Sequence, residues 1–175
     1  KLCHANVRSL KSRNSDGIME KFEYIKNNLS SFDIITISET WLTTDYDSSL
    51  FLLSDFQEPF RKDREAGYGG VLAWISSNIA CKRRLDFEVP ELEAMWLEIR
   101  SHNNKFFLCI AYRKPSCVNF WDLLQSSLDI VLEIQGAKIV LTGDLNADFN
   151  TMEGTKLRTL ASNYELTIHN PRFKR

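Results

Sequence analysis

Segments whose apolar residues recur with the period of a helix alternate along this chain with short apolar runs of the length of a strand. Apolar residues recur every three or four positions over residues 17–30 and 120–134, which predicts two amphipathic helices. A third helix is expected over residues 152–162. Strand-like apolar runs lie at residues 2–7, 33–38, 71–75, 80–85, 94–100, 106–112 and 138–142, and a short strand is expected at 164–168. The pattern thus predicts helix-flanked strands near both ends of the chain and consecutive strands between them.

Local residue chemistry marks where several of these elements should begin and end. Ser15 and Asp16 are expected to cap the first helix, and Gly136 to terminate the second. The polar residues 101–104 are expected to form a hairpin turn. Because parallel pairing requires a crossover connection, the consecutive central strands should be antiparallel. We therefore predict the α/β (α+β) class, as a two-sheet α/β sandwich in a single domain over residues 1–175, and disfavour a doubly wound parallel sheet.

Two of the apolar strands lead directly to an acidic residue. Glu39 follows the strand over residues 33–38, and Asp144 follows the strand over 138–142. On an extended chain, Asp144 and Asn146 would point to the same side because they are two positions apart. Gly143 would let the backbone turn and approach a neighbouring chain closely. Two buried strands that each end on an acid suggest one metal-assisted hydrolytic site.

Each candidate residue also has an ordinary structural interpretation. Asp144 and Asn146 could form only an Asx-turn, and Glu39 could be a solvated strand end. Asn6 could be part of a turn, and Tyr112 could be a core aromatic with a solvated hydroxyl. The functional interpretation is favoured by convergence, because these positions all lie at ends of apolar strands and would meet at one edge of a sandwich.

Charge is balanced over the whole chain but clustered locally. The 22 Lys and Arg residues against 23 Asp and Glu give a net charge of -1, so no overall positive field points to nucleic acid. Short basic groups occur at Lys11 with Arg13, Arg61-Lys62 with Arg64, Lys82-Arg83-Arg84, Arg113-Lys114, and Arg172 with Lys174-Arg175. Solvated faces are the usual explanation of such groups. Arg113 is the exception, because it follows Tyr112 at the expected active edge and could enter a DNA groove or contact phosphate.

Cysteine spacing and hydropathy limit the class of protein further. The cysteines Cys3, Cys81, Cys109 and Cys117 show no paired spacing, which favours reduced thiols and an intracellular protein. No apolar run approaches the roughly 20 residues of a membrane-spanning helix, and no signal peptide is present, so no membrane partner is expected. The chain begins with Lys1 rather than Met, which suggests a piece of a longer protein.

Six sequence blocks, taken in order, resemble the endonuclease/exonuclease/phosphatase (DNase I-like) superfamily. They are Asn6-Val7-Arg8-Ser9-Leu10, Ser38-Glu39-Thr40-Trp41-Leu42, Arg61-Lys62-Asp63-Arg64 with Gly69-Gly70-Val71, Trp96-Leu97-Glu98-Ile99, Ala111-Tyr112-Arg113-Lys114-Pro115, and Gly143-Asp144-Leu145-Asn146-Ala147-Asp148. The first three blocks resemble in particular the endonuclease domain of jockey-like non-LTR retrotransposons.

The resemblance implies a role for each candidate residue. Glu39 would be the ligand of a divalent cation, Mg²⁺ or Mn²⁺, which prefers carboxylate oxygen. Asp144 would orient or deprotonate the attacking water, while Asn6 and Asn146 would donate amide hydrogen bonds to phosphate or to that aspartate. Tyr112 would bind a phosphate oxygen or stabilise developing charge. The partner would be DNA, nicked to leave a 3′ hydroxyl that primes reverse transcription, with a reverse transcriptase domain in the parent polyprotein and a nuclear location.

One departure from the resemblance changes the expected activity. The superfamily continues with a Ser-x-x-Asp-like segment and a Ser-Asp-His motif, and neither occurs in this sequence. We therefore expect a domain that is incomplete at its C-terminus, lacks its last strands, has little activity alone and self-associates through exposed sheet edges. Phosphoinositide phosphatases, sphingomyelinases and abasic-site endonucleases are alternatives within the same fold. A non-catalytic nucleic-acid- or protein-binding remnant is the alternative from a different class.

Overall fold

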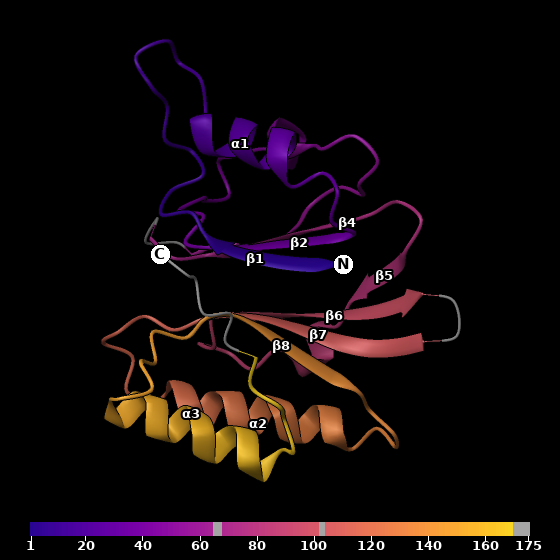
Figure 1. Cartoon of the computed structure of the whole chain (residues 1–175), viewed down its shortest axis with the longest axis vertical. Helices are drawn as coiled ribbons and strands as arrows, with labels where there is room; N and C mark the ends of the chain where they lie inside the picture. The colour runs from indigo at the N-terminus through magenta and orange to yellow at the C-terminus, as the bar shows by residue number, and fades with distance from the viewer. Residues whose placement is uncertain (65–67, 102–103, 170–175) are drawn as a thin grey trace.

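The chain folds into four layers, with two mixed β-sheets packed face to face and helices covering both outer faces (Figure 1). This computed structural model describes residues 1–64, 68–101 and 104–169. The first sheet has the strand order β1-β2-β4-β3 and the second β5-β6-β7-β8. The strands are β1 (Leu2–Asn6), β2 (Ile34–Ser38), β3 (Phe60–Lys62), β4 (Val71–Ile75), β5 (Ala80–Arg83), β6 (Ala94–Ser101), β7 (Asn104–Tyr112) and β8 (Ile139–Asp144). The helices are α1 (Glu20–Asn28), α2 (Phe120–Leu132) and α3 (Met152–Asn163), with short 3-10 turns at Ser48–Phe51 and Leu85–Phe87. The predicted two-sheet α/β sandwich is confirmed.

Each sheet contains one parallel β-α-β unit. Strands β1 and β2 pair in parallel and are joined through α1, while β7 and β8 pair in parallel and are joined through α2. The remaining strand pairs are antiparallel, as predicted for strands without a crossover helix. The C-terminal ends of both parallel pairs lie at the same edge of the sandwich, on the left in Figure 1.

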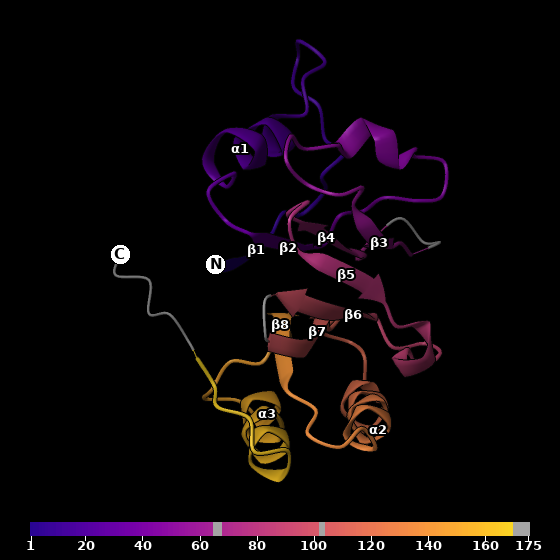
Figure 2. The ribbon, with the colours of Figure 1, turned by 90° about the vertical axis from the view of Figure 1, so that its right-hand side faces the viewer.

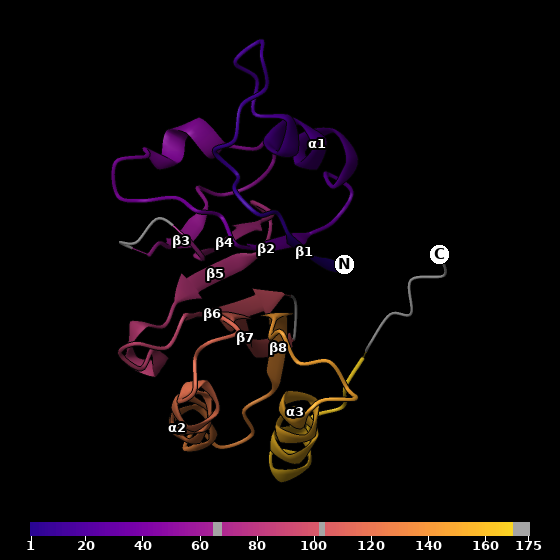
Figure 3. The ribbon, with the colours of Figure 1, turned by 90° about the vertical axis from the view of Figure 1, so that its left-hand side faces the viewer.

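Apolar side chains fill three spaces between the layers. The first cluster lies between α1 and the first sheet, the second between the two sheets, and the third between the second sheet and the pair α2 and α3. The views in Figures 2 and 3 show these layers from the side, with α2 and α3 next to each other. Typical members are Phe22 and Trp74 in the first cluster, Ile75 and Leu108 in the second, and Trp96 and Leu128 in the third. Strands β2 and β4 are buried along their whole length, which explains their uninterrupted apolar runs.

The start of α1 differs from the prediction. The helix begins at Glu20, and neither Ser15 nor Asp16 caps it. Instead, the Asn14 side chain accepts hydrogen bonds from the backbone N–H groups of Asp16 and Ile18, and Gly17 has a φ of 76°. The capping prediction is wrong, because the turn around Asn14 takes up Asp16 and the helix starts after it.

One helix end and two strands also differ from the prediction. Helix α2 ends at Leu132, and Gly136, with a φ of 71°, lies in the turn beyond its end. Residues 164–168 do not form a strand, because the Leu166 N–H donates to the Ala161 carbonyl and the chain folds back on α3. The short strand β3 was not predicted, since its charged residues give no apolar run. Strands β6 and β7 pair antiparallel as expected, although residues 102–103 of the predicted turn lie outside the described residues.

The end strands are β1 and β3 in the first sheet and β5 and β8 in the second. Each therefore has one edge without a strand partner in the part of the chain that the structure describes. Self-association through such an edge stays a prediction. Among the described residues, no helix has the length and apolar character needed to cross a membrane.

Candidate active site

The side chain of Asn6 joins the two predicted acidic residues at one edge of the sandwich. Its Nδ2 atom donates to Glu39 Oε1 at 2.7 Å and to Asp144 Oδ2 at 2.7 Å. Asn6 ends β1, Glu39 directly follows β2, and Asp144 ends β8, so the three residues come from both sheets. One amide nitrogen at hydrogen-bond distance from both carboxylates requires these to lie side by side. The structure thus brings together three residues that the sequence placed at separate strand ends.

Glu39 is held in an uncommon backbone conformation. Its φ is 55°, and Trp41 also has a φ of 55°. The intervening backbone is fixed from outside, because the N–H groups of Thr40 and Trp41 donate to the carbonyls of Gly70 and Gly69. The Trp41 indole Nε1 also donates to Glu39 Oε2 at 3.3 Å. Left-handed backbone at a non-glycine residue costs of order 1 kcal/mol and persists where the surroundings enforce it, which is typical of functional sites.

Tyr112 directs its hydroxyl to the same place from the end of β7. The phenol lies close enough to Glu39 to interact with its carboxylate, and Tyr112 is buried. Burial raises the pKa of Tyr112 to about 12, and the nearby negative charge of Glu39 adds to this effect. The hydroxyl therefore keeps its proton at neutral pH and can act as a hydrogen-bond donor in the site.

The segment after β8 forms the Asx-turn that the sequence left open as an alternative. The Asn146 N–H donates to Asp144 Oδ1 at 3.0 Å, and Asn146 has a φ of 45°. Because the chain turns here, Asn146 does not share a face with Asp144. Its side-chain Nδ2 donates instead to the carbonyl of Arg113 at 2.7 Å. Asn146 thus braces the loop and orients Asp144 through its backbone, whereas we had expected its amide to face the substrate.

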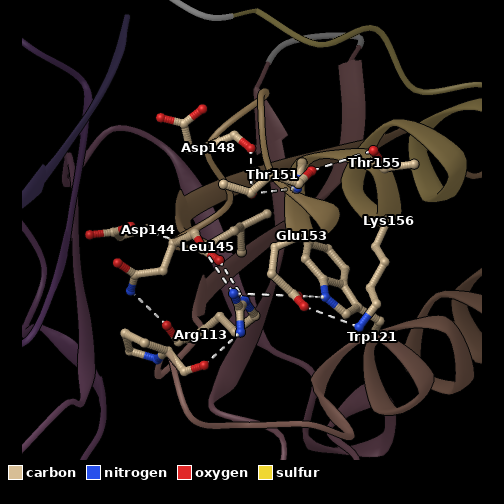
Figure 4. Close-up of polar contacts among 12 residues, drawn as sticks. Arg113, Trp121, Asp144, Leu145, Asp148, Thr151, Glu153, Thr155 and Lys156 are labelled. Atoms are coloured by element: carbon tan, nitrogen blue, oxygen red, sulfur yellow. Dashed lines mark hydrogen bonds and ion pairs between the residues drawn. The ribbon is translucent and has the colours of Figure 1, made fainter.

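Arg113 lies inside the protein rather than in a surface groove. Its side chain is 3% exposed, and its guanidinium donates to the carbonyls of Leu145, Asn146 and Pro115. One Nη atom also lies 3.3 Å from the Glu153 carboxylate. Figure 4 shows the guanidinium between the loop after β8 and the Glu153 side chain. The expected phosphate contact is therefore wrong for this structure, because Arg113 is occupied in holding the loop that carries Asp144.

A groove of about 380 Å³ lies next to these residues, with Tyr112 and Glu93 in its lining. Basic residues Lys62, Arg64 and Lys114 also line it. The lining carries charge of both signs, because Asp63 and Glu91 also belong to it, and Lys62 and Arg64 are paired with Glu88 and Glu93.

Comparison with family models gives a match over nearly the whole chain. The model described as the endonuclease/exonuclease/phosphatase family matches residues 3–171. The chain belongs to this family. Apart from Leu2 at the start of β1, the match covers the strands and helices described above, including the strand ends that carry Asn6, Glu39, Tyr112 and Asp144. Comparison with curated protein sequences found no significant match.

Solved structures of the same fold include several nucleic-acid enzymes. The endonuclease domain of TRAS1, a telomere-specific non-LTR retrotransposon, aligns with a TM-score of 0.70 at 13% identity, over 97% of this chain and 74% of that one. AP endonuclease LMAP from Leishmania major aligns with a TM-score of 0.64 at 13% identity, over 93% and 66%. The 3′ phosphatase NExo from Neisseria, bound to a product DNA hairpin, gives 0.63 at 13% identity, over 92% and 70%. These similarities establish the DNase I-like fold, and this family member spans about two thirds to three quarters of each neighbour.

The donor set of the site fits a hard divalent cation. Glu39, the predicted ligand, offers carboxylate oxygens, which Mg²⁺ and Mn²⁺ prefer over nitrogen and sulfur. Among residues 1–64, 68–101 and 104–169, no group of three or more His, Cys, Asp and Glu residues could hold a metal ion. A magnesium site does not require such a group, because Mg²⁺ keeps several waters and needs only one or two protein carboxylates with a substrate phosphate.

Two further residues lie near the carboxylates of Glu39 and Asp144 and were not predicted from the sequence as part of the site. His4 lies two positions before Asn6 on β1, with Nδ1 3.0 Å from Thr36 Oγ1 and Nε2 3.3 Å from Ser38 Oγ. Its two-residue spacing from Asn6 was the available signal. Glu93 lies just before β6, and its carboxylate accepts a hydrogen bond from the Gly70 N–H. No local pattern marked Glu93, because its partner is 23 residues away.

The partly buried His4 gives the stability of the fold a pH dependence of its own. Burial lowers the pKa of His4 from 6.5 to about 4, against an opposing effect of Asp144. Between these values the unfolded chain binds a proton that the folded chain does not, so stability falls as pH falls from 6.5 toward 4. We expect His4→Asn to remove up to about 3 kcal/mol of this pH-dependent loss, measured by urea unfolding at pH 7 and pH 4.5.

A matched variant tests whether this effect belongs to His4. His169 is exposed, so His169→Asn should leave the difference between the two pH values as in the wild type. Equal losses of stability in His4→Asn and wild type would contradict the assignment.

Proposed function

We propose that this chain is a divalent-metal-dependent phosphodiesterase domain that nicks DNA. The observation that carries the proposal is the shared amide of Asn6, which holds Glu39 and Asp144 together at the edge where the strands end. Membership of the endonuclease/exonuclease/phosphatase family supports the reaction class. The groove that Tyr112 lines supplies Lys62, Arg64 and Lys114 as cationic groups for a phosphate backbone, beside the acidic Asp63, Glu91 and Glu93.

Each residue has a role that follows from its contacts. A bound Mg²⁺ or Mn²⁺, held by Glu39, would polarise the scissile phosphate and offset charge on the leaving oxygen. Asp144, oriented by Asn6 and by the Asn146 N–H, accepts the proton of the attacking water. Tyr112 donates its hydroxyl to a phosphate oxygen as charge develops.

The substrate and biological context extend this proposal. The jockey-like sequence blocks favour target DNA of a non-LTR retrotransposon as the substrate, and the fold of the TRAS1 domain agrees with that choice. A reverse transcriptase domain in the parent polyprotein and a nuclear location belong to the same proposal. Since this sequence contains no Ser-Asp-His motif, we expect slow turnover when the chain is assayed by itself.

The test is conversion of supercoiled plasmid to open circles, with enzyme in excess over DNA and with Mg²⁺ or Mn²⁺ present. We expect slow nicking that EDTA abolishes, and product ends that a DNA polymerase can extend because they carry a 3′ hydroxyl. Binding to the plasmid should weaken steeply with added salt, since backbone contacts release counterions. Abasic-site DNA, a phosphoinositide and sphingomyelin, assayed in parallel, separate the alternatives within the fold.

Two results would oppose the proposal. Turnover of a lipid or inositol phosphate with intact DNA left uncut would assign the site to another branch of the family. Metal binding with no turnover of any substrate would favour the non-catalytic binding module.

A further inference from the structure

Glu93 connects the two sheets at the edge that carries the paired carboxylates. Its backbone carbonyl accepts a hydrogen bond from the Tyr112 N–H at 2.9 Å, which attaches it to the second sheet. Its carboxylate accepts a hydrogen bond from the Gly70 N–H, which attaches it to the turn before β4 in the first sheet. The side chain is 16% exposed, so this contact lies largely away from solvent. A single residue thus bonds one sheet through its backbone and the other through its side chain.

The turn that receives the Glu93 carboxylate is the same turn that fixes the backbone after Glu39. The Gly69 carbonyl accepts from the Trp41 N–H at 2.9 Å, and the Gly70 carbonyl accepts from the Thr40 N–H at 3.3 Å. Gly69 has a φ of 85°, and a Cβ there would overlap the Glu93 carboxylate. Glycine at this position therefore serves both the left-handed turn and the close approach of Glu93.

We infer that Glu93 is a positioning residue, which sets the place of the Glu39 carboxylate relative to the Tyr112 hydroxyl. This inference rests on the proposed function, in which Glu39 holds the metal ion and Tyr112 contacts the phosphate. The path runs from the Glu93 carboxylate through the Gly69-Gly70 turn to the strained segment that begins at Glu39, and from the Glu93 backbone to Tyr112.

A purely structural ion pair does not account for this arrangement. Arg64 lies 3.6 Å from Glu93, and its side chain is 36% exposed, so this pair contributes little to stability. Burial raises the pKa of the Glu93 carboxyl, while its bond from Gly70 and the charge of Arg64 oppose the change. The carboxylate is therefore kept in a partly desolvated place where its main partner is the turn that positions Glu39.

The test compares Glu93→Ala, Glu93→Gln and the control Glu91→Ala, which removes a carboxylate from the exposed rim of the same groove. The first readout is amide hydrogen exchange at Thr40 and Trp41, compared with Ile37 in β2 and measured at low temperature where each variant is folded. The second readout is the affinity of each protein for Mn²⁺, titrated without DNA. Exchange does not depend on metal or catalysis, so it tests the path even if the proposed function fails.

In Glu93→Ala we expect exchange at Thr40 and Trp41 to be about 10-fold faster while Ile37 is unchanged, because only the local turn loosens. Affinity for Mn²⁺ should fall by about 10-fold, as is typical when support for a metal ligand is removed. Glu93→Gln keeps an oxygen acceptor for the Gly70 N–H and should restore both values to within about threefold of wild type. Glu91→Ala should match the wild type in both readouts.

The inference is overturned if Glu93→Ala lowers the global stability but leaves Thr40 and Trp41 exchange no faster than that of Ile37. It is also overturned if Glu93→Gln is as impaired as Glu93→Ala, because the loss would then follow the charge rather than the hydrogen bond. If the wild type neither binds Mn²⁺ nor cuts DNA, the proposed function fails, and the exchange result alone decides whether Glu93 positions the Glu39 segment.

Discussion

Glu39→Gln is expected to reduce metal-dependent nicking by about 10³-fold and to remove measurable Mn²⁺ binding, because the metal would lose its charged ligand. The glutamine has the same shape and can still accept the hydrogen bond that Asn6 Nδ2 now gives to Glu39 Oε1. The strained backbone around Glu39 is held by the Gly69 and Gly70 carbonyls and does not depend on the side chain. The stability of the variant should therefore stay within about 1 kcal/mol of wild type, measured by urea unfolding.

Two comparisons make this result specific. Glu58→Gln removes a carboxylate from an exposed position and should change neither activity nor metal binding. Asp144→Asn should lose nicking to a similar degree while keeping Mn²⁺ affinity within a few-fold, since Asp144 acts on the water in the proposed reaction. A Glu39→Gln protein that nicks DNA at the wild-type rate would refute the assignment of Glu39 as metal ligand.

The layered fold could be predicted because its central strands are buried on both faces and are therefore continuous apolar runs. Strands β2 and β4 lie between layers and are apolar throughout, so run length and turn signals located them. Strand β3 could not be found in this way, because it has only three residues and two of them are Arg61 and Lys62. Its place depends on antiparallel pairing with β4, which is a tertiary contact.

The sequence predicted those residues of the site whose positions are set by the end of a strand. Asn6, Glu39 and Asp144 lie at the ends of apolar strands, and parallel connections bring those ends to one edge. The position of Asn146 was wrong because the two-residue rule assumes an extended chain, and the chain turns at this residue with a φ of 45°. The positive φ of Glu39 has no local signal, since it is enforced by carbonyls about thirty residues away in sequence.

Arg113 shows why a basic residue next to a site cannot be assigned to substrate from sequence alone. The loop after β8 turns its Leu145 and Asn146 carbonyls inward, and buried carbonyls need donors. A guanidinium can supply several donors in one plane, so the arginine is used inside the protein. Its contribution to the site is indirect, because the loop that it holds also orients Asp144.

Arg113→Met is accordingly expected to destabilise the fold by about 3–5 kcal/mol, because it leaves the carbonyls of Leu145, Asn146 and Pro115 without the donor that they share. In a chain of this size that loss corresponds to a fall in Tm of about 10 °C, measurable by thermal unfolding followed by circular dichroism. Arg158→Met is the matched control. Arg158 also donates to a backbone carbonyl, that of Phe149 at 2.7 Å, but its side chain is exposed and its loss should cost less than about 1 kcal/mol.

The same variant separates the observed role of Arg113 from the groove contact that the sequence suggested. If the guanidinium met DNA phosphate, Arg113→Met would keep its stability and would reduce the salt dependence of DNA binding by about one counterion. If the guanidinium instead holds the loop, the stability of Arg113→Met falls, and the salt dependence of DNA binding by its folded molecules is unchanged. Arg113→Lys sharpens the distinction, since lysine keeps the charge for a phosphate but cannot reach the Leu145, Asn146 and Pro115 carbonyls together. We therefore expect Arg113→Lys to be destabilised nearly as much as Arg113→Met, and a lysine variant of wild-type stability would contradict the buried role.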